Sequence, residues 1–77
     1  MHLREREEEI VRKVVGSLIE LSRRDIIEFK HVDTERGLII ITYKGCEFTI
    51  KLYLVYYPET PEEWVRSLEN VFEMDCK

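Results

Sequence analysis

Two cysteines, Cys46 and Cys76, and two histidines, His2 and His31, are the residues of this chain that most readily do chemistry. Thiols can pair as a disulfide, bind a soft metal or act as nucleophiles, and imidazoles can bind metal or exchange protons near neutral pH. A structural zinc site needs four such ligands at short paired spacings, and these four residues are widely separated. We therefore expect neither a metal site nor a cofactor.

The separation of the two cysteines bears on whether they form a disulfide. Cys46 begins a predicted strand of about twelve residues, which spans about 40 Å, and Cys76 follows a predicted helix of about fourteen residues, which spans about 21 Å. Because this helix must run back along the sheet, Cys76 should fall short of Cys46, and a disulfide needs Cα atoms within about 7 Å. We predict free thiols. A bent strand, or a link between two chains, would instead permit a disulfide.

Acidic residues are frequent, but their positions are typical of helix structure. Glu62 and Glu63 follow Thr60 and Pro61. That sequence predicts a capped helix start, where carboxylates complement the helix dipole. The run "EREEE" at residues 5–9 fits the exposed face of another helix. We therefore assign no catalytic residue.

Charge and composition limit the classes of partner. The chain has 12 basic and 16 acidic residues, for a net charge of −4, which argues against a partner held by its phosphate backbone. No apolar run approaches the roughly 20 residues that span a bilayer, and the N-terminus is too charged for a signal peptide. We expect a cytoplasmic protein without a membrane partner. A charged fraction of 36% resembles hyperthermophile composition, and intracellular disulfides occur in such organisms.

Hydrophobic periodicity predicts a single α+β domain over residues 1–77, with the order α-β-β-β-α and a three-stranded antiparallel meander. Apolar residues spaced by three and four predict the first helix, and a period of two predicts the strands. The predicted elements are a helix from Leu3 to about Arg24, strands over 26–32, 38–43 and 46–57, and a helix capped by Thr60 that runs to about Met74.

Strand register predicts which face of the sheet is the core. If Lys44 and Gly45 form a two-residue hairpin turn, apolar residues of the second and third strands pair directly. The predicted pairs are Tyr43 with Cys46, Ile41 with Phe48, and Ile39 with Ile50. An odd-length first turn places Ile27, Phe29 and His31 on the same face. We expect both helices to pack mainly on this face.

Apolar side chains also gather on the opposite face, where Val32 lies at the edge and the third strand outruns the second. The predicted partner-binding residues are Leu38, Ile40, Tyr53, Val55 and Tyr57. If both helices cover the other face, this patch is exposed and the strand end is unpaired, as is typical of partner sites. A symmetric homodimer would bury the patch against itself. Alternatively, the second helix covers this face, so that both faces are internal.

The predicted function is that of a small interaction or accessory protein, homodimeric and without evident catalytic activity. A nucleic-acid-binding module using a basic stripe of Lys30, Lys44 and Lys51 is one alternative. A small enzyme or thiol protein using Cys46 is another. The element order resembles that of double-stranded-RNA-binding domains, which carry a lysine cluster at the start of the second helix. This chain has acids there, so the likeness in order does not imply RNA binding.

Overall fold

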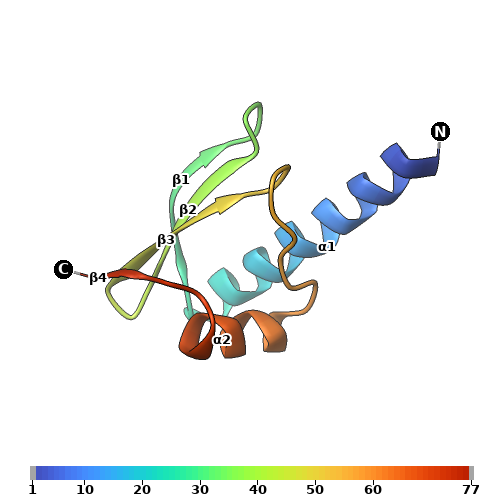
Figure 1. Ribbon diagram of the computed structural model, residues 1–77. Helices are drawn as coiled ribbons and strands as arrows, with labels where there is room; N and C mark the ends of the chain where they lie inside the picture. Colours follow the sequence, from blue (N-terminus) through green and yellow to red (C-terminus); the bar gives the residue numbers. More distant parts are fainter. Residues whose placement is uncertain (1, 77) are drawn as a thin grey trace.

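A computed structural model describes the backbone of residues 2–76 and the side chains of residues 7–76. It shows two helices and a four-stranded antiparallel sheet, so the α+β class is confirmed (Figure 1). The elements are α1 (His2–Arg23), β1 (Glu28–Asp33), β2 (Leu38–Tyr43), β3 (Cys46–Lys51), α2 (Pro61–Asn70) and β4 (Asp75–Cys76).

The sheet has one strand more than the sequence predicts. Its order is β1-β2-β3-β4, and β4 pairs antiparallel with the beginning of β3. The extra strand arises because α2 ends at Asn70 and not near Met74, which leaves enough chain to return to the sheet. Two residues are too few to give a periodic signal, so β4 has no signature in the sequence.

The hairpin between β2 and β3 has the predicted register. Tyr43 pairs with Cys46, Ile41 with Phe48, and Ile39 with Ile50. The two turn residues both have positive φ, 50° at Lys44 and 81° at Gly45. This is the backbone of a type I′ turn, whose twist matches that of the flanking strands.

The pairing of β1 with β2 contains a bulge that the sequence does not predict. Phe29 pairs with Ile41, but the register shifts between Phe29 and His31, so that His31 pairs with Ile40 and Val32 with Ile39. One extra residue in a strand reverses the facing of every later side chain. The predictions that His31 faces the core and that Val32 faces away from it are therefore wrong.

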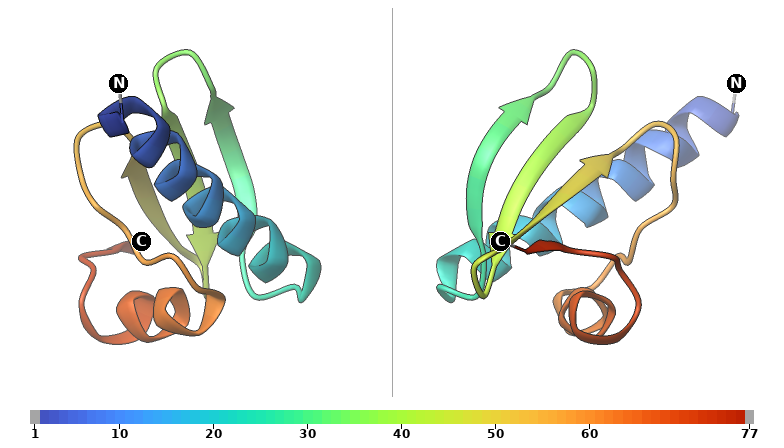
Figure 2. Two further views of the ribbon diagram at one scale, coloured as in Figure 1. Left: turned by 90° about the vertical axis from the view of Figure 1, so that its right-hand side faces the viewer. Right: turned by 60° about the vertical axis from the view of Figure 1, so that its left-hand side comes forward.

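Both helices pack against the same face of the sheet, and the alternative with one helix on each face is not what the structure has (Figure 2). Leu18 of α1 and Trp64 of α2 join Ile41 and Ile50 in one buried cluster. The remaining buried apolar members are Val14, Leu21, Ile27, Ile39, Tyr43 and Leu68. Neither α1 nor α2 lies on the opposite face of the sheet.

Helix α1 ends in a hydrogen-bonded cap. Asp25 has a φ of 60°, the left-handed conformation that closes many helices. The Ile26 amide donates to the Leu21 carbonyl at 2.9 Å and the Asp25 amide donates to the Ser22 carbonyl at 3.1 Å. This pair of bonds turns the chain into β1 and lets Ile26 pack beside the core.

Ion pairs stabilise the end of α1 and connect the helix to the segment before α2. Arg24 pairs with Glu20, four residues earlier in the chain, at 3.0 Å. Lys13 pairs with Glu59, which precedes α2, at 3.7 Å. Ser17 Oγ also lies 2.8 Å from the Glu59 carbonyl, so α1 is tied to the segment that leads into α2.

Helix α2 begins as its sequence predicts. The Thr60 side chain accepts a hydrogen bond from the Glu63 amide at 3.3 Å, and Pro61 occupies the first turn. The helix ends where the amides of Val71 and Phe72 both donate to the Ser67 carbonyl, each at 2.8 Å. This tight closure directs Phe72 back toward the sheet, where its ring stacks on Phe48 at 4.5 Å.

Candidate interaction surface

Strand β3 ends at Lys51, six residues before the predicted end. The amides of Leu54 and Val55 both donate to the Lys51 carbonyl, at 3.1 and 3.2 Å, so the chain makes a helical turn there. Tyr57 then returns to the strand, and its hydroxyl accepts a hydrogen bond from the Lys51 amide at 2.9 Å. The prediction of a long third strand with an unpaired end is therefore wrong. Residues 52–57 form a loop, which we call the aromatic loop.

The aromatic loop is anchored at both ends. At its start, the Leu52 amide donates to the Gly37 carbonyl at 2.8 Å. The Tyr53 ring lies so close to Gly37 that a methyl group added to the glycine would overlap it. At its end, the Tyr57 ring stacks on the buried Trp64 ring, with centroids 5.6 Å apart. The loop therefore has a defined shape, although its middle touches little of the protein.

The middle of the aromatic loop exposes four consecutive large side chains. The exposed fractions are 66% for Tyr53, 80% for Leu54, 50% for Val55 and 85% for Tyr56. Single exposed apolar residues are normal on protein surfaces, whereas a contiguous group of this size is typical of an interaction site.

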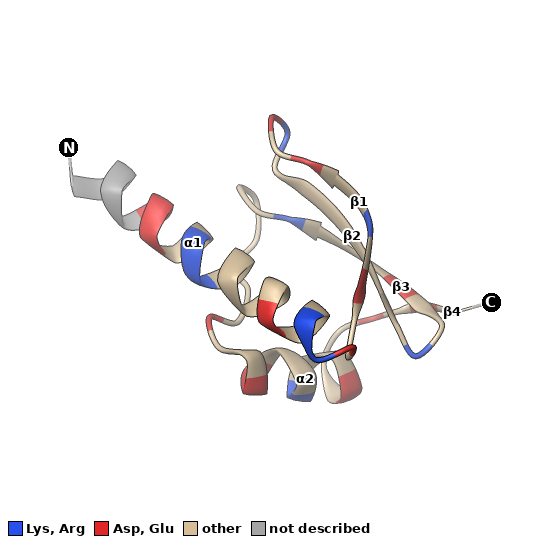
Figure 3. Cartoon of the chain, turned by 180° about the vertical axis from the view of Figure 1, so that it is seen from behind, with Lys and Arg blue, Asp and Glu red and all other residues tan. Residues whose placement is uncertain are grey.

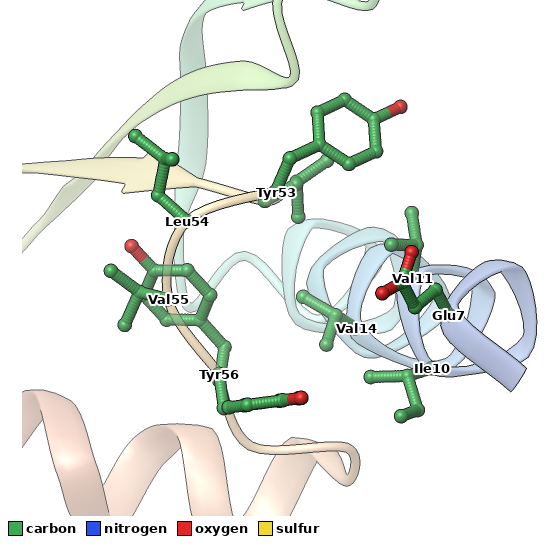
Figure 4. A pocket seen from close by; sticks show the side chains of 10 residues that line it. Glu7, Ile10, Val11, Val14, Tyr53, Leu54, Val55 and Tyr56 are labelled. Atoms are coloured by element: carbon green, nitrogen blue, oxygen red, sulfur yellow. The ribbon is translucent and has the colours of Figure 1, made fainter. Parts of the chain in front are cut away.

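A groove of about 260 Å³ separates the aromatic loop from α1. Ile10, Val11 and Val14 line the α1 side of the groove with apolar side chains. Glu7, also on α1, adds a carboxylate to this side (Figure 4). The loop contributes Leu52, Tyr53, Leu54, Val55, Tyr56 and Tyr57. Aromatic rings and aliphatic side chains thus surround an open space that carries one acidic group.

The structure divides the predicted partner-binding residues among three places. Tyr53 and Val55 lie in the exposed part of the aromatic loop. Tyr57 is half-buried and points into the core. Leu38 and Ile40 are half-buried on the sheet face that carries no helix, opposite Lys51 and Thr49 respectively. The predicted single patch does not form, because it assumed that β3 continued straight.

Sequence reasoning missed the α1 side of the groove and two residues of the loop. Because Tyr53, Val55 and Tyr57 are expected on the opposite face, strand alternation places Leu54 and Tyr56 on the core face, yet these two are the most exposed large apolar side chains of the described residues. The signal that was present is the run "YLVYYP", in which apolar residues follow one another without the alternation of a half-buried strand. Such a run fits a loop that presents side chains in several directions.

Four aromatic rings pack together beneath the aromatic loop. Phe48, Tyr57, Trp64 and Phe72 have ring centroids between 4.5 and 6.3 Å apart, in stacked, tilted and edge-on arrangements. Trp64 is fully buried, and its Nε1 has no hydrogen-bond partner among the described residues. This packing holds Tyr57, the last residue of the aromatic loop, against the core.

Cys46 and Cys76 form a disulfide, so the prediction of free thiols is wrong. The two residues are directly paired between β3 and β4, with Cα atoms 4.3 Å apart. The two cysteines meet because β3 is half as long as predicted and α2 ends early, which allows the chain to reach the start of β3. With Cys46 in a disulfide, the alternative of a thiol enzyme has no thiolate in this state of the protein.

Along the described chain, Lys and Arg positions are interspersed with Asp and Glu positions on both helices and on the sheet (Figure 3). Lys30, the first member of the predicted basic stripe, forms an ion pair with Glu47 across the sheet. Lys44 lies in the hairpin turn, with its ammonium group 5.3 Å from the centre of the Tyr43 ring. The stripe is thus interrupted by acidic charge on the face that would contact a nucleic acid.

Comparisons with known proteins give no relative: no family model, no curated protein and no solved structure matches the chain. Within the described residues, no three His, Cys, Asp or Glu side chains are grouped so that they could hold a metal ion. No described helix has the length and apolar character needed to cross a membrane.

Proposed function

We propose that this protein is a small interaction or accessory protein that works as a homodimer, with the aromatic loop and the facing part of α1 as the contact surface. The observation that carries the proposal is the exposure of Tyr53, Leu54, Val55 and Tyr56, at 50–85% each, beside an apolar groove. Burying such side chains removes apolar surface from water, which is the main driving force for association.

The size of the surface supports a second copy as the partner. At these exposures the four side chains present on the order of 500 Å² per chain, taking about 200 Å² for a fully exposed aromatic residue. A standard interface buries roughly 800 Å² per partner. The half-buried Ile10 and Val11 beside the groove can supply part of the difference. In a symmetric dimer the same patch covers itself, so no other partner is needed to bury it.

The five residues predicted from the sequence have different parts in this proposal. Tyr53 and Val55 contact the second copy, and Tyr57 holds the loop in position through Lys51 and Trp64. Leu38 and Ile40 lie on the sheet face without a helix. For these two residues we propose a smaller, separate contact with a partner.

Sedimentation velocity of the Val55→Glu variant tests the dimer. The wild type should sediment as a dimer at micromolar concentration and the variant as a monomer, because a carboxylate without a partner is costly to bury in an apolar contact. Val71→Glu is the matched control, since Val71 is 68% exposed and lies after α2, away from the groove. Far-ultraviolet circular dichroism should show both variants folded. A monomeric wild type, or a dimeric Val55→Glu variant, would contradict the proposal.

We also propose a cytoplasmic location. The highly charged composition resembles that of hyperthermophiles, whose intracellular proteins often carry disulfides. Cells quenched in acid and treated with an alkylating agent should therefore contain the protein with Cys46 and Cys76 protected. If both cysteines of the protein from a cytoplasmic fraction are alkylated, the protein has no disulfide in that compartment. This result would contradict a cytoplasmic location for the disulfide-bonded protein.

A further inference from the structure

The proposed contact surface carries both signs of charge, so opposite charges can meet when it pairs with itself. Glu7 lines the groove, and an adjoining hollow is lined by Glu7, Glu8, Val11, Arg12 and Tyr53. The Tyr53 ring, Glu7 and Val11 border both spaces. The cation Arg12 therefore lies four and five residues along α1 from the acids Glu8 and Glu7, at the edge of the exposed aromatic patch.

Arg12 has no charged or hydrogen-bonding partner among the described side chains. Neither Arg12 nor Glu7 makes an ion pair or a side-chain hydrogen bond with any described residue, and both are exposed. Lys13, the next residue, pairs with Glu59, and Arg24 pairs with Glu20. Among the described residues, Arg12 is thus a cation of α1 without a partner, and it borders the hollow beside the groove.

The chemistry of the groove suits a guanidinium group. Tyr53 offers the face of an aromatic ring, on which arginine stacks well, and Glu7 offers a carboxylate beside it. The aliphatic part of an arginine side chain can cover Val11 while its charged end reaches the acid. In a two-fold contact, if residue i touches residue j of the second copy, then j also touches i, so each contact forms twice.

We propose that in the homodimer Arg12 of each chain crosses to the second copy and binds between the Tyr53 ring and the Glu7 carboxylate. This inference rests on the proposed function, because it requires the aromatic loops to face each other. It names the specific contact: two symmetry-related pairs of Arg12 with Glu7, at either side of the apolar centre. The pairs fix the register of the two helices, while the loop side chains supply the buried area.

A charge-exchange experiment measured by sedimentation equilibrium tests this contact. Arg12→Glu places like charges together twice and should raise the dimer Kd about a hundredfold or more. Glu7→Arg alone should have a similar effect. The double variant Glu7→Arg with Arg12→Glu restores opposite charges and the original net charge, so its Kd should return to within about tenfold of the wild type. Arg66→Glu, an exposed arginine of α2, is the matched control and should leave the Kd unchanged.

The outcomes separate the two proposals. If the wild type is monomeric, the proposed homodimer is wrong and this contact is wrong with it. If the wild type is a dimer that Val55→Glu dissociates but Arg12→Glu does not weaken, the dimer stands and the Arg12 contact is wrong. A double variant that is weaker than both single variants also overturns the contact, because exchange of a true pair recovers affinity. Unchanged melting curves of the monomeric variants would show that lost affinity does not reflect lost folding.

Discussion

Removal of the Cys46–Cys76 disulfide should cost this small protein a large part of its stability. The two residues are 30 positions apart in sequence. For a closed loop of about this length, the chain-entropy relation gives roughly 3.5 to 4 kcal/mol at 25 °C. A chain of 77 residues has a total free energy of unfolding of about 4 to 12 kcal/mol. The disulfide therefore supplies from a third to nearly all of the net stability.

The variant that tests this is Cys46→Ser with Cys76→Ser. Its melting temperature, followed by circular dichroism, should fall by roughly 15 to 25 °C relative to the oxidised wild type. Reduced wild type should melt within a few degrees of the variant, because serine is close in size to cysteine and the lost cross-link is the same. Urea titrations of the three samples should give the same order of midpoints.

Local release of β4 should accompany the loss of stability. β4 pairs with β3 through two residues, so little besides the disulfide holds it. Amide exchange at Asp75 and Cys76 should become fast in the serine variant, while Ile41 in the central strand should remain protected. The reasoning would be refuted if the oxidised wild type and the variant melted within about 5 °C of each other. Two titratable thiols in the unreduced, unfolded wild type would refute the disulfide itself.

Three further predictions concern the backbone and the loop. Gly16 lies in α1 with open space where a methyl group would be, so Gly16→Ala should raise the free energy of unfolding by about 1 kcal/mol, measured by urea titration; a loss of stability would show that the space is used. Gly37 has a φ of 64° and lies against the Tyr53 ring. Gly37→Ala should therefore lower the free energy of unfolding by more than the roughly 1 to 2 kcal/mol that backbone strain alone would cost. Adding Tyr53→Ala should restore only the part of this loss that comes from overlap with the ring. Tyr57→Phe leaves the Lys51 amide without its acceptor and should cost about 1 kcal/mol with faster exchange of that amide; an unchanged exchange rate would contradict the bond.

The parts of the fold that depend on local patterns were predictable. The Lys44–Gly45 turn fixes the pairing of β2 with β3, because a two-residue hairpin allows one register for the alternating apolar residues. The start of α2 was equally clear, since the Thr60 cap, Pro61 and Glu63 act within one turn of helix.

The end of β3 was not predictable, because it is decided by contacts distant in sequence. No glycine or proline interrupts residues 46–57, so nothing local signals a turn at Lys51. The turn is held by Tyr57, whose hydroxyl binds the Lys51 amide while its ring stacks on Trp64 of α2. The misplaced patch follows from this error, and the missed disulfide follows from it together with the early end of α2.

Part of the exposed surface was predictable, but its surroundings were not. An exposed apolar surface that includes Tyr53 and Val55 was expected, and both side chains are exposed. The groove beside α1 was not predicted. Periodicity identifies which face of a helix is apolar, but it does not show which loop lies against that face. The bulge in β1 was missed for a similar reason: one added residue leaves the composition of the strand unchanged.

β4 pairs with the start of β3, and the Tyr57 hydroxyl binds the amide of the last residue of that strand. These contacts affect how the protein behaves at high concentration. Amyloid-like growth requires a strand that can accept another strand from the next molecule, indefinitely. On the β3 side of the sheet that position is filled in part from within the same chain, by β4 at Cys46 and Glu47 and by Tyr57 at Lys51, and the disulfide keeps β4 in place. Reducing agents should therefore shorten the time before thioflavin-binding fibrils form in concentrated solutions.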